Sequence, residues 1–463
     1  MNLFSLISLL VVMAALCSYL NYRYIQLPTT IGVMVTALVA SLLLLAAGST
    51  ATGIHAWATA LVGRIDFNEA VLHGILAFLL FAGALQLDVG ELSKEKWVIG
   101  LLAVVGTSIS AFLVGLGAYI IFRFIGLQLE LMPCLLFGAL ISPTDPIAVL
   151  AIMQKVGAPK RLEIQIAGES LFNDGVGVVM FLTLLELSKG QATPGVGDVT
   201  LLLVREVGGG ILLGLAAGLL TYYMLRKVNE YQVEILLTLA LAMGGFALAD
   251  ALHFSAPITA VVAGLFIGNH GRAFAMSAKT REHVDTFWEL LDGILNAILF
   301  LLIGLEVLVM PFHGRNFLAG LCMIPVTLLA RWLSVGAIVA PLRHPLSCDR
   351  GTVRILTWGA LRGGISVAMA LSLPISNARE PLLIATYVVV IFSIIAQGLT
   401  VDQFIRWILG ESKSVGNGVA HGLDTDHGWQ PVPRSPVRSA SPGGVRSPSP
   451  SSWAPDDCST SCE

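Results

Sequence analysis

Charged residues are scarce in this 463-residue chain. Asp, Glu, Lys and Arg together make up only 12% of it, whereas hydrophobic residues make up 56%. A soluble globular domain carries about a quarter charged residues, so this composition excludes an ordinary soluble protein. Apolar blocks of about 18 to 25 residues recur along the chain, and each is long enough to cross roughly 30 Å of hydrocarbon as a helix. The sequence therefore predicts an all-α polytopic membrane protein.

Disulfide, metal and nucleotide patterns are missing as well. Cys17, Cys134 and Cys322 fall within apolar blocks, and the chain has no cysteine spacing typical of a disulfide framework or a metal site. It has no P-loop either. We therefore expect a protein that uses no cofactor, no ATP and no nucleic-acid partner, and that is not an enzyme.

Thirteen apolar segments are candidate membrane spans. They lie near residues 3–20, 28–49, 69–87, 97–122, 131–154, 163–188, 201–224, 232–251, 256–270, 286–310, 316–340, 353–374 and 381–409. The fifth and the twelfth are interrupted by proline or glycine. If spans 1 to 6 and 8 to 13 are inverted repeats, these two hold corresponding positions, as is typical of transport sites at the membrane midplane.

Basic residues predict the orientation, because Lys and Arg in short loops are retained on the cytoplasmic side. They concentrate in loops after odd-numbered spans, such as Lys94 and Lys96 after the third. This bias predicts a multi-pass protein of the cell (inner) membrane with its N-terminus outside and its C-terminus in the cytoplasm. The first span lacks the basic region of a cleavable signal peptide. After a transmembrane domain over 1–410, residues 411–463 are rich in Ser, Pro and Gly and are predicted to form a disordered cytoplasmic tail.

The stretch GESLFNDG places charged and polar residues in front of an apolar run. On a helix Glu169 and Asn173 share one stripe, and Ser170 and Asp174 share the next. Charge inside a membrane is costly, so such groups normally pair or line a water-filled pathway. One stripe is suited to a basic partner, and the other to a small cation.

The stretch SPTDP breaks the fifth span. Pro143 and Pro146 remove two backbone donors, and Asp145 lies between them. Unwound backbone at membrane depth is tolerated around a cavity or where protein buries it, and its free carbonyls are natural cation ligands. Thr144 adds a carbonyl or hydroxyl oxygen. Oxygen-only ligation suits a hard monovalent cation such as sodium.

The stretch WGALRGG places Arg362 among Gly359, Gly363 and Gly364 in the twelfth span. A lone arginine in a membrane needs an anion. Glu169 is the predicted partner, because Asp174 would be a poor cation site if a guanidinium already neutralised it. The glycines indicate a second discontinuous helix.

The order of these three stretches resembles the monovalent cation:proton antiporter family, in its sodium-proton exchanger branch of prokaryotic type. The resemblance covers roughly residues 3 to 410, and it implies thirteen helices per protomer with two crossed, partly unwound helices at the site. It also implies a homodimer, in which core helices from about 69–188 and 286–409 move against dimerisation helices from the remainder.

The resemblance also implies roles for the residues of these stretches. The predicted cation- and proton-binding set, which holds sodium as the transported substrate, is Asp174, Ser170 and Thr144. The predicted organising set is Asp145, Glu169, Asn173 and Arg362. In this assignment Asp145 balances the ends of the broken helices, and Asn173 orders the site beside the Glu169 and Arg362 pair.

Competition at one carboxylate then predicts the mechanism. Sodium, or lithium, and a proton exclude each other at Asp174, and exchange is driven by whichever gradient is larger, in support of pH and sodium homeostasis. Asn173 stands where electrogenic relatives carry a second aspartate, so the resemblance implies electroneutral exchange of one proton for one sodium ion.

Other classes fit less well. An intramembrane aspartyl protease using Asp145 and Asp174 would carry a GxGD motif, which is absent, and a rhomboid-type protease needs a buried histidine, whereas the histidines lie mainly at loops and span ends. A potassium-proton exchanger and a channel-like uniporter of the same fold remain open. Glu306 and Arg331, also within spans, are interpreted as structural charges that pair with neighbours or reach an interface.

Overall fold

The computed structural model describes residues 3–46, 74–188, 196–308, 310, 313–346 and 351–419. All regular elements within these ranges are helices, and the one bridge between extended segments joins Asp145 and Leu361. The prediction of an all-α fold is therefore confirmed. Met1–Ser414 forms one compact unit and Val415–Glu463 a second. Most of the predicted tail lies outside the described residues, and its disorder stays a prediction.

The helices include several short π-helical turns, labelled η. In chain order they are α1 (Leu3–Leu20), η1 (Asn21–Ile25), α2 (Thr29–Ala46), α4 (Leu76–Gln86), α5 (Val89–Lys94), α6 (Lys96–Leu101), η3 (Leu102–Gly106), α7 (Thr107–Phe124), α8 (Leu131–Ile141), α9 (Ile147–Val156), α10 (Lys160–Ser188), α11 (Val196–Leu225), α12 (Tyr231–Ala251), α13 (Ala256–Phe266), η4 (Ile267–Gly271), α14 (Arg272–Phe274), α15 (Ala278–Glu306), α16 (Gly314–Leu346), α17 (Thr352–Trp358), α18 (Gly364–Leu371), α19 (Arg379–Phe392), η5 (Ser393–Gln397) and α20 (Gly398–Val419).

Each of the thirteen predicted spans coincides with helix in the part of the chain that the structure describes. Nine helical runs there are long and apolar enough to cross a membrane. The other four predicted spans correspond to the shorter helices α4 and α13 and to the two interrupted pairs, α8 with α9 and α17 with α18. The interruptions explain why the two pairs fall short of a continuous span.

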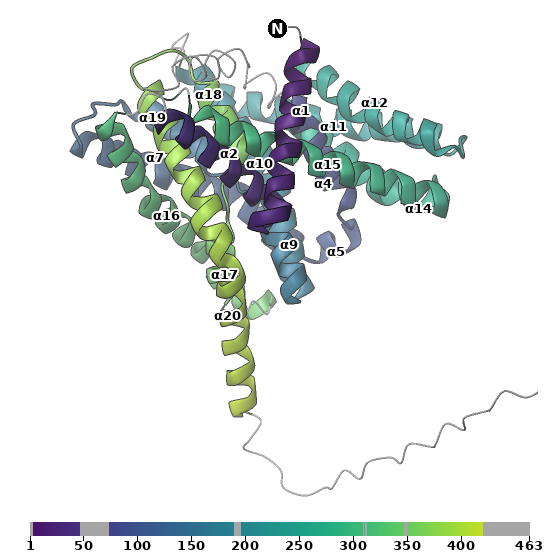
Figure 1. The fold of residues 1–463 in the computed structure, drawn as a ribbon. Helices are drawn as coiled ribbons and strands as arrows, with labels where there is room; N and C mark the ends of the chain where they lie inside the picture. Colours follow the sequence, from purple (N-terminus) through teal and green to yellow (C-terminus); the bar gives the residue numbers. More distant parts are fainter. Residues whose placement is uncertain are drawn as a thin grey trace, which may run out of the picture. The chain divides into compact units, whose positions relative to one another are not determined.

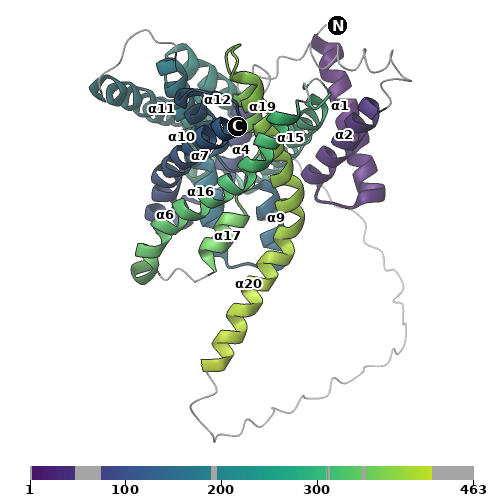
Figure 2. The same ribbon diagram turned by 90° about the vertical axis from the view of Figure 1, so that its left-hand side faces the viewer.

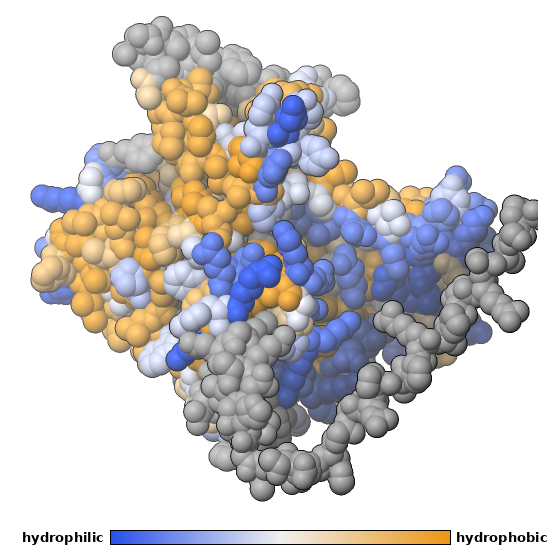
Figure 3. Space-filling model, turned by 60° about the horizontal axis from the view of Figure 1, so that its bottom comes forward, coloured by the Kyte–Doolittle hydropathy of each residue, from blue (hydrophilic) through white to orange (hydrophobic). Residues whose placement is uncertain are grey.

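Helix α7 illustrates how the apolar surface is divided between protein and lipid. Phe112, Leu116 and Ile120 are spaced four residues apart and exposed, whereas Ala111 and Ala118 on the opposite stripe are buried. A continuous stripe of exposed large apolar side chains is costly in water but not in a bilayer. Figure 3 shows the corresponding pattern, with hydrophobic residues covering one flank and hydrophilic residues gathered on the face turned towards the viewer.

Small residues allow the buried helices to approach closely. α7 packs along α8, and α4 packs along α13. Figures 1 and 2 show α7 lying beside α16 as well. A Cβ added at Gly138 on α8 would lie 2.0 Å from the Ala111 carbonyl oxygen, and one at Gly264 on α13 would lie 2.7 Å from that of Phe81. Glycine at these contacts lets backbones touch, which is the usual means of helix association in membranes. The division into core and dimerisation helices stays a prediction.

Candidate functional site

The first interruption separates α8 from α9. α8 ends at Ile141 and α9 begins at Ile147, so residues 142–146 leave the helical path. Pro143 and Pro146 lack the backbone N–H that would continue the ladder, and this explains the break. Arg362 donates through Nη1 to the backbone oxygens of Ser142 and Pro143, the second at 3.0 Å. The carbonyls freed after α8 are therefore satisfied by a charge from the break between α17 and α18.

The second interruption crosses the first. α17 ends at Trp358 and α18 begins at Gly364, and the backbone N–H of Asp145 donates to the Leu361 carbonyl at 2.8 Å. This hydrogen bond forms the antiparallel bridge between the two unwound segments. A Cβ on Gly363 would lie 2.7 Å from both Cβ and Oδ2 of Asp145, so only glycine permits this approach. The predicted crossing of two discontinuous helices is confirmed.

A buried polar cluster joins the first break to α10. The Asn173 amide donates to Thr144 Oγ1 at 2.9 Å and accepts from the Thr144 backbone N–H at 3.3 Å. The hydroxyls of Thr144 and Ser170 are 3.0 Å apart. All three residues are at most 2% exposed. The structure thus brings together, beside Asp174, the hydroxyl and amide groups that the sequence marked as candidates.

Asp174 borders a cavity of about 700 Å³, and Thr144 and Asp145 line it too. Six carboxylates and a single base line this cavity among the described residues: Asp88, Glu91, Asp145, Glu163, Asp174, Asp292 and, as the base, Lys160. Asp88 and Glu91 come from α5 and its N-cap, in a loop that the sequence predicts to be cytoplasmic. The cavity therefore joins a polar end of the molecule to the crossing of the broken helices, and its walls attract cations.

Asp145 lies where two helices begin. α9 starts two residues later, and α18 starts at Gly364, beside the Asp145 carboxylate. The free N–H groups at a helix N-terminus carry partial positive charge, which a carboxylate stabilises. Asp145 and Asp174 line the same cavity, so their carboxylates repel each other.

The predicted pairing of Glu169 with Arg362 is wrong. Glu169 Oε1 instead lies 2.5 Å from Nη1 of Arg331, and both side chains are buried. Arg331 also donates to the Leu356 carbonyl at 3.4 Å through Nε and Nη2 and thereby connects α16 to α10 and α17. Arg362 is occupied by the carbonyls of the first break. Arg331, interpreted from sequence as a structural charge, is thus the residue that neutralises Glu169.

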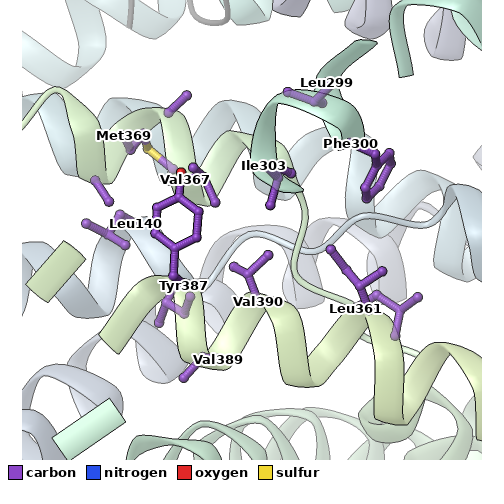
Figure 4. Packing of buried hydrophobic residues seen from close by; sticks show 14 of the residues in the cluster. Leu140, Leu299, Phe300, Ile303, Leu361, Val367, Met369, Tyr387, Val389 and Val390 are labelled. Carbon is purple, nitrogen blue, oxygen red and sulfur yellow. The ribbon is translucent and has the colours of Figure 1, made fainter. Parts of the chain in front are cut away.

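A hydrophobic layer packs against the breaks. Figure 4 shows Tyr387 and Val390 of α19 facing Ile303 of α15 and Val367 of α18, with Leu140 of α8 nearby. Leu299 of α15 belongs to the same layer and also lines the cavity. Leu299, Val367, Tyr387 and Val390 are almost fully buried, so packed protein backs the cavity wall at Leu299.

Comparison with known proteins identifies the family. The family model described as sodium/hydrogen exchanger, transmembrane, matches residues 11–407. The chain belongs to this family. It is 48% identical over 410 residues to the Na(+)/H(+) antiporter NhaP of Pseudomonas aeruginosa, covering 87% of this chain and 96% of that one. It is 36% identical over 349 residues to the Na(+)/H(+) antiporter NhaH of Halobacillus dabanensis, covering 73% and 83% of the two chains.

The solved structure of the sodium proton antiporter MjNhaP1 from Methanocaldococcus jannaschii has the same fold as this exchanger-family chain. The TM-score is 0.69 at 18% sequence identity, over 89% of this chain and all of that one. At this identity the match concerns the fold alone. It agrees with the fold class predicted from the sequence.

Two cavity residues receive no role from the sequence. Asp292 and Asn296 of α15 line the cavity with Asp174, although they lie more than a hundred residues further along the chain. Their spacing of four residues in an apolar span is a signal that could have found them, since such a pair occupies one helix face.

Proposed function

We propose that this chain is a secondary active transporter that exchanges sodium, and lithium as a second cation, for protons across the membrane. The supporting observation is that Asp174 lines an acidic cavity that reaches the crossing of two broken helices. A cation arriving there meets the Asp174 carboxylate with Thr144 and Ser170 oxygens alongside. Oxygen ligands around one carboxylate suit a hard monovalent cation.

Exchange follows from competition for one negative charge. Either sodium or a proton neutralises Asp174, so the occupied site can cross between inward-open and outward-open states by alternating access. The empty carboxylate is held back by the cost of moving a bare charge through a low-dielectric barrier. The packed layer around Leu299 and Tyr387 forms that barrier on the side away from the cavity.

Electroneutral exchange, one proton for one sodium ion, is supported by what surrounds Asp174. Asn173 is neutral and its amide is engaged with Thr144. Glu169 is paired with Arg331 and lies apart from the cavity lining. Asp145, beside two helix N-termini, is proposed to stay ionised throughout. One carboxylate is then left to exchange its ligand.

The proposal also covers the orientation of the protein in the membrane and its oligomeric state. The cavity opens at α5, α9 and the start of α10, whose loops carry the basic residues predicted to be cytoplasmic. The chain then lies in the cell membrane with its N-terminus outside. It works as a homodimer in which the core helices move against the dimerisation helices.

Proteoliposomes with an imposed proton gradient test the exchange. Sodium should dissipate the gradient in the wild type, and Asp174→Asn should abolish this flux, because an amide neither releases a proton nor supplies an anionic ligand. Glu163→Gln is the matched control, since it removes a charge from the same cavity. Sodium-driven proton flux that survives in Asp174→Asn would contradict the assignment. Dissipation by potassium but not by sodium would favour the potassium exchanger.

Stoichiometry requires a separate measurement. The membrane potential is clamped with valinomycin and potassium after potassium has been shown not to be a substrate. Moving one elementary charge is worth about 2.3 kcal/mol per 100 mV, so an electrogenic cycle responds strongly to voltage. Electroneutral exchange should reach the same ion gradients at every voltage. A voltage-dependent equilibrium would show that a second proton is carried.

A further inference from the structure

Asn296 has an unusual environment for a buried amide. It is 1% exposed, lies on α15 and lines the acidic cavity. Its Nδ2 donates to the backbone oxygen of Asp292 at 2.9 Å, and this fixes the orientation of the amide, because a carbonyl oxygen accepts only from the nitrogen. Its Oδ1 is buried and accepts no hydrogen bond from the described residues. An unpartnered buried acceptor is costly unless something else supplies a positive partner.

Asp292 places a carboxylate on the same helix face as this amide. It precedes Asn296 by four residues, one turn earlier on α15. Asp292 also lines the cavity. Leu299, one turn after Asn296 on α15, packs against Gly364 at the start of α18, so the pair lies near the crossing of the broken helices.

These groups match the needs of a partly hydrated alkali cation. One carboxylate and one neutral amide oxygen share a helix face, and the cavity leaves room for the water molecules that complete the shell. Lys160 is the single base among the described lining residues, and it belongs to the first turn of α10, away from α15.

We propose that Asp292 and Asn296 form a second subsite for a monovalent alkali cation, occupied before the ion reaches Asp174. The inference rests on the proposed exchange function and adds a waiting position to it. A cation held there raises the local cation concentration at Asp174. It also weakens the charge repulsion among the carboxylates of Asp145, Asp174 and Asp292. The subsite contributes affinity and not turnover, because neither residue exchanges a proton in the cycle.

Kinetics in proteoliposomes at constant ionic strength test the subsite. Asp292→Asn should raise the apparent KM for sodium about tenfold, in the range by which local charge changes ion capture, with the maximal rate kept within about twofold. Asn296→Ala keeps the charge but removes the oxygen, and it should raise the KM by a smaller factor. Glu163→Gln removes an equal charge from the cavity wall at the first turn of α10 and should raise the KM by a clearly smaller factor than Asp292→Asn does.

A binding measurement gives a readout without transport. In Asp174→Asn protein the proposed transport site is disabled, yet sodium should still raise the melting temperature relative to equal choline. The double variant Asp174→Asn with Asp292→Asn should lose this stabilisation.

Three results would overturn the subsite. They are an equal KM change in Glu163→Gln and Asp292→Asn, a loss of maximal rate without a KM change in Asp292→Asn, and sodium stabilisation that persists in the double variant. Failure of the exchange function itself is distinct, because the wild type would then show no sodium-driven proton flux.

Discussion

The regions around Arg331 and Arg362 contain the same side chain at nearly the same depth, 3% and 4% exposed, yet they hold it in different ways. Arg331 faces the full negative charge of Glu169. Arg362 faces the carbonyls that the break after α8 leaves free, and its own backbone N–H donates to Ser393 Oγ at 3.0 Å. One arginine neutralises an ion, whereas the other replaces lost helix hydrogen bonds. A buried guanidinium in a membrane therefore does not by itself indicate a carboxylate partner.

The largest effect is expected from Arg331→Ala. It leaves Glu169 as an unpaired buried charge, which typically costs about 3–5 kcal/mol. The melting temperature in detergent should fall sharply and expression should drop. The double variant with Glu169→Gln should recover most of the loss, because no charge is then stranded. If the double variant were no more stable than Arg331→Ala, the pairing would be refuted.

Arg362→Ala should have the second-largest effect, with a smaller loss of stability than Arg331→Ala. It strands no ionised side chain but removes the single donor group, Nη1, that Ser142 and Pro143 share, and a hydrogen bond to a charged group is worth about 1.5–3 kcal/mol. Here Glu169→Gln should give no rescue, which separates this region from that of Arg331. Thermal denaturation of the single and double variants measures the difference. Rescue by Glu169→Gln would restore the pairing expected from sequence.

Gly363→Ala examines the crossing that Arg362 supports. Its Cβ would collide with Asp145, and overpacking of this kind costs about 1–3 kcal/mol. Because the collision displaces Asp145, the sodium-driven proton flux should fall severalfold, while the melting temperature should fall only modestly. Gly336→Ala on α16 is the matched control, since a Cβ there meets nothing within 4 Å. Equal flux in the two variants would mean that the close approach is unimportant.

The smallest effect is expected from Thr144→Val, which keeps the shape of the side chain and removes its hydroxyl. The Asn173 amide and the Ser170 hydroxyl lose a shared partner, at a cost of about 1 kcal/mol. If Thr144 is also a cation ligand, the KM for sodium should rise while the melting temperature changes little. Thr183→Val on α10, whose hydroxyl bonds only within its own helix, controls for the loss of a buried hydroxyl.

Local patterns were sufficient to predict most of the elements of the site. Proline predicts a break wherever it occurs in an apolar span, because it lacks a backbone N–H itself. Pro143 and Pro146 therefore predict the break after α8. The four-residue spacing in GESLFNDG predicts that Ser170 and Asp174 share a face, because helix geometry is constant. These features depend on neighbours along the chain, so no knowledge of packing was needed.

Partners across the molecule were less predictable. Glu169 has two buried arginines available, and the sequence predicts Arg362 because a lone arginine in the twelfth span needs an anion, whereas Arg331 is interpreted as a structural charge. The choice failed because a guanidinium binds carbonyl oxygens as readily as a carboxylate when the carbonyls are freed by a break. Asn296 and Asp292 were missed for a related reason, since their importance comes from the cavity that they line.

Hydrophobicity and backbone chemistry are properties of consecutive residues, so they predict without a structure that this chain lies in lipid, where its spans run and which of them are interrupted. The order and spacing of the three motifs indicate the family in the same way. Packing was needed to show that Arg331 neutralises Glu169, that Gly363 admits Asp145, and that α15 contributes to the cavity. Those contacts join helices distant in sequence, and several pairings are nearly equal in chemistry until packing brings one pair of atoms within hydrogen-bonding distance.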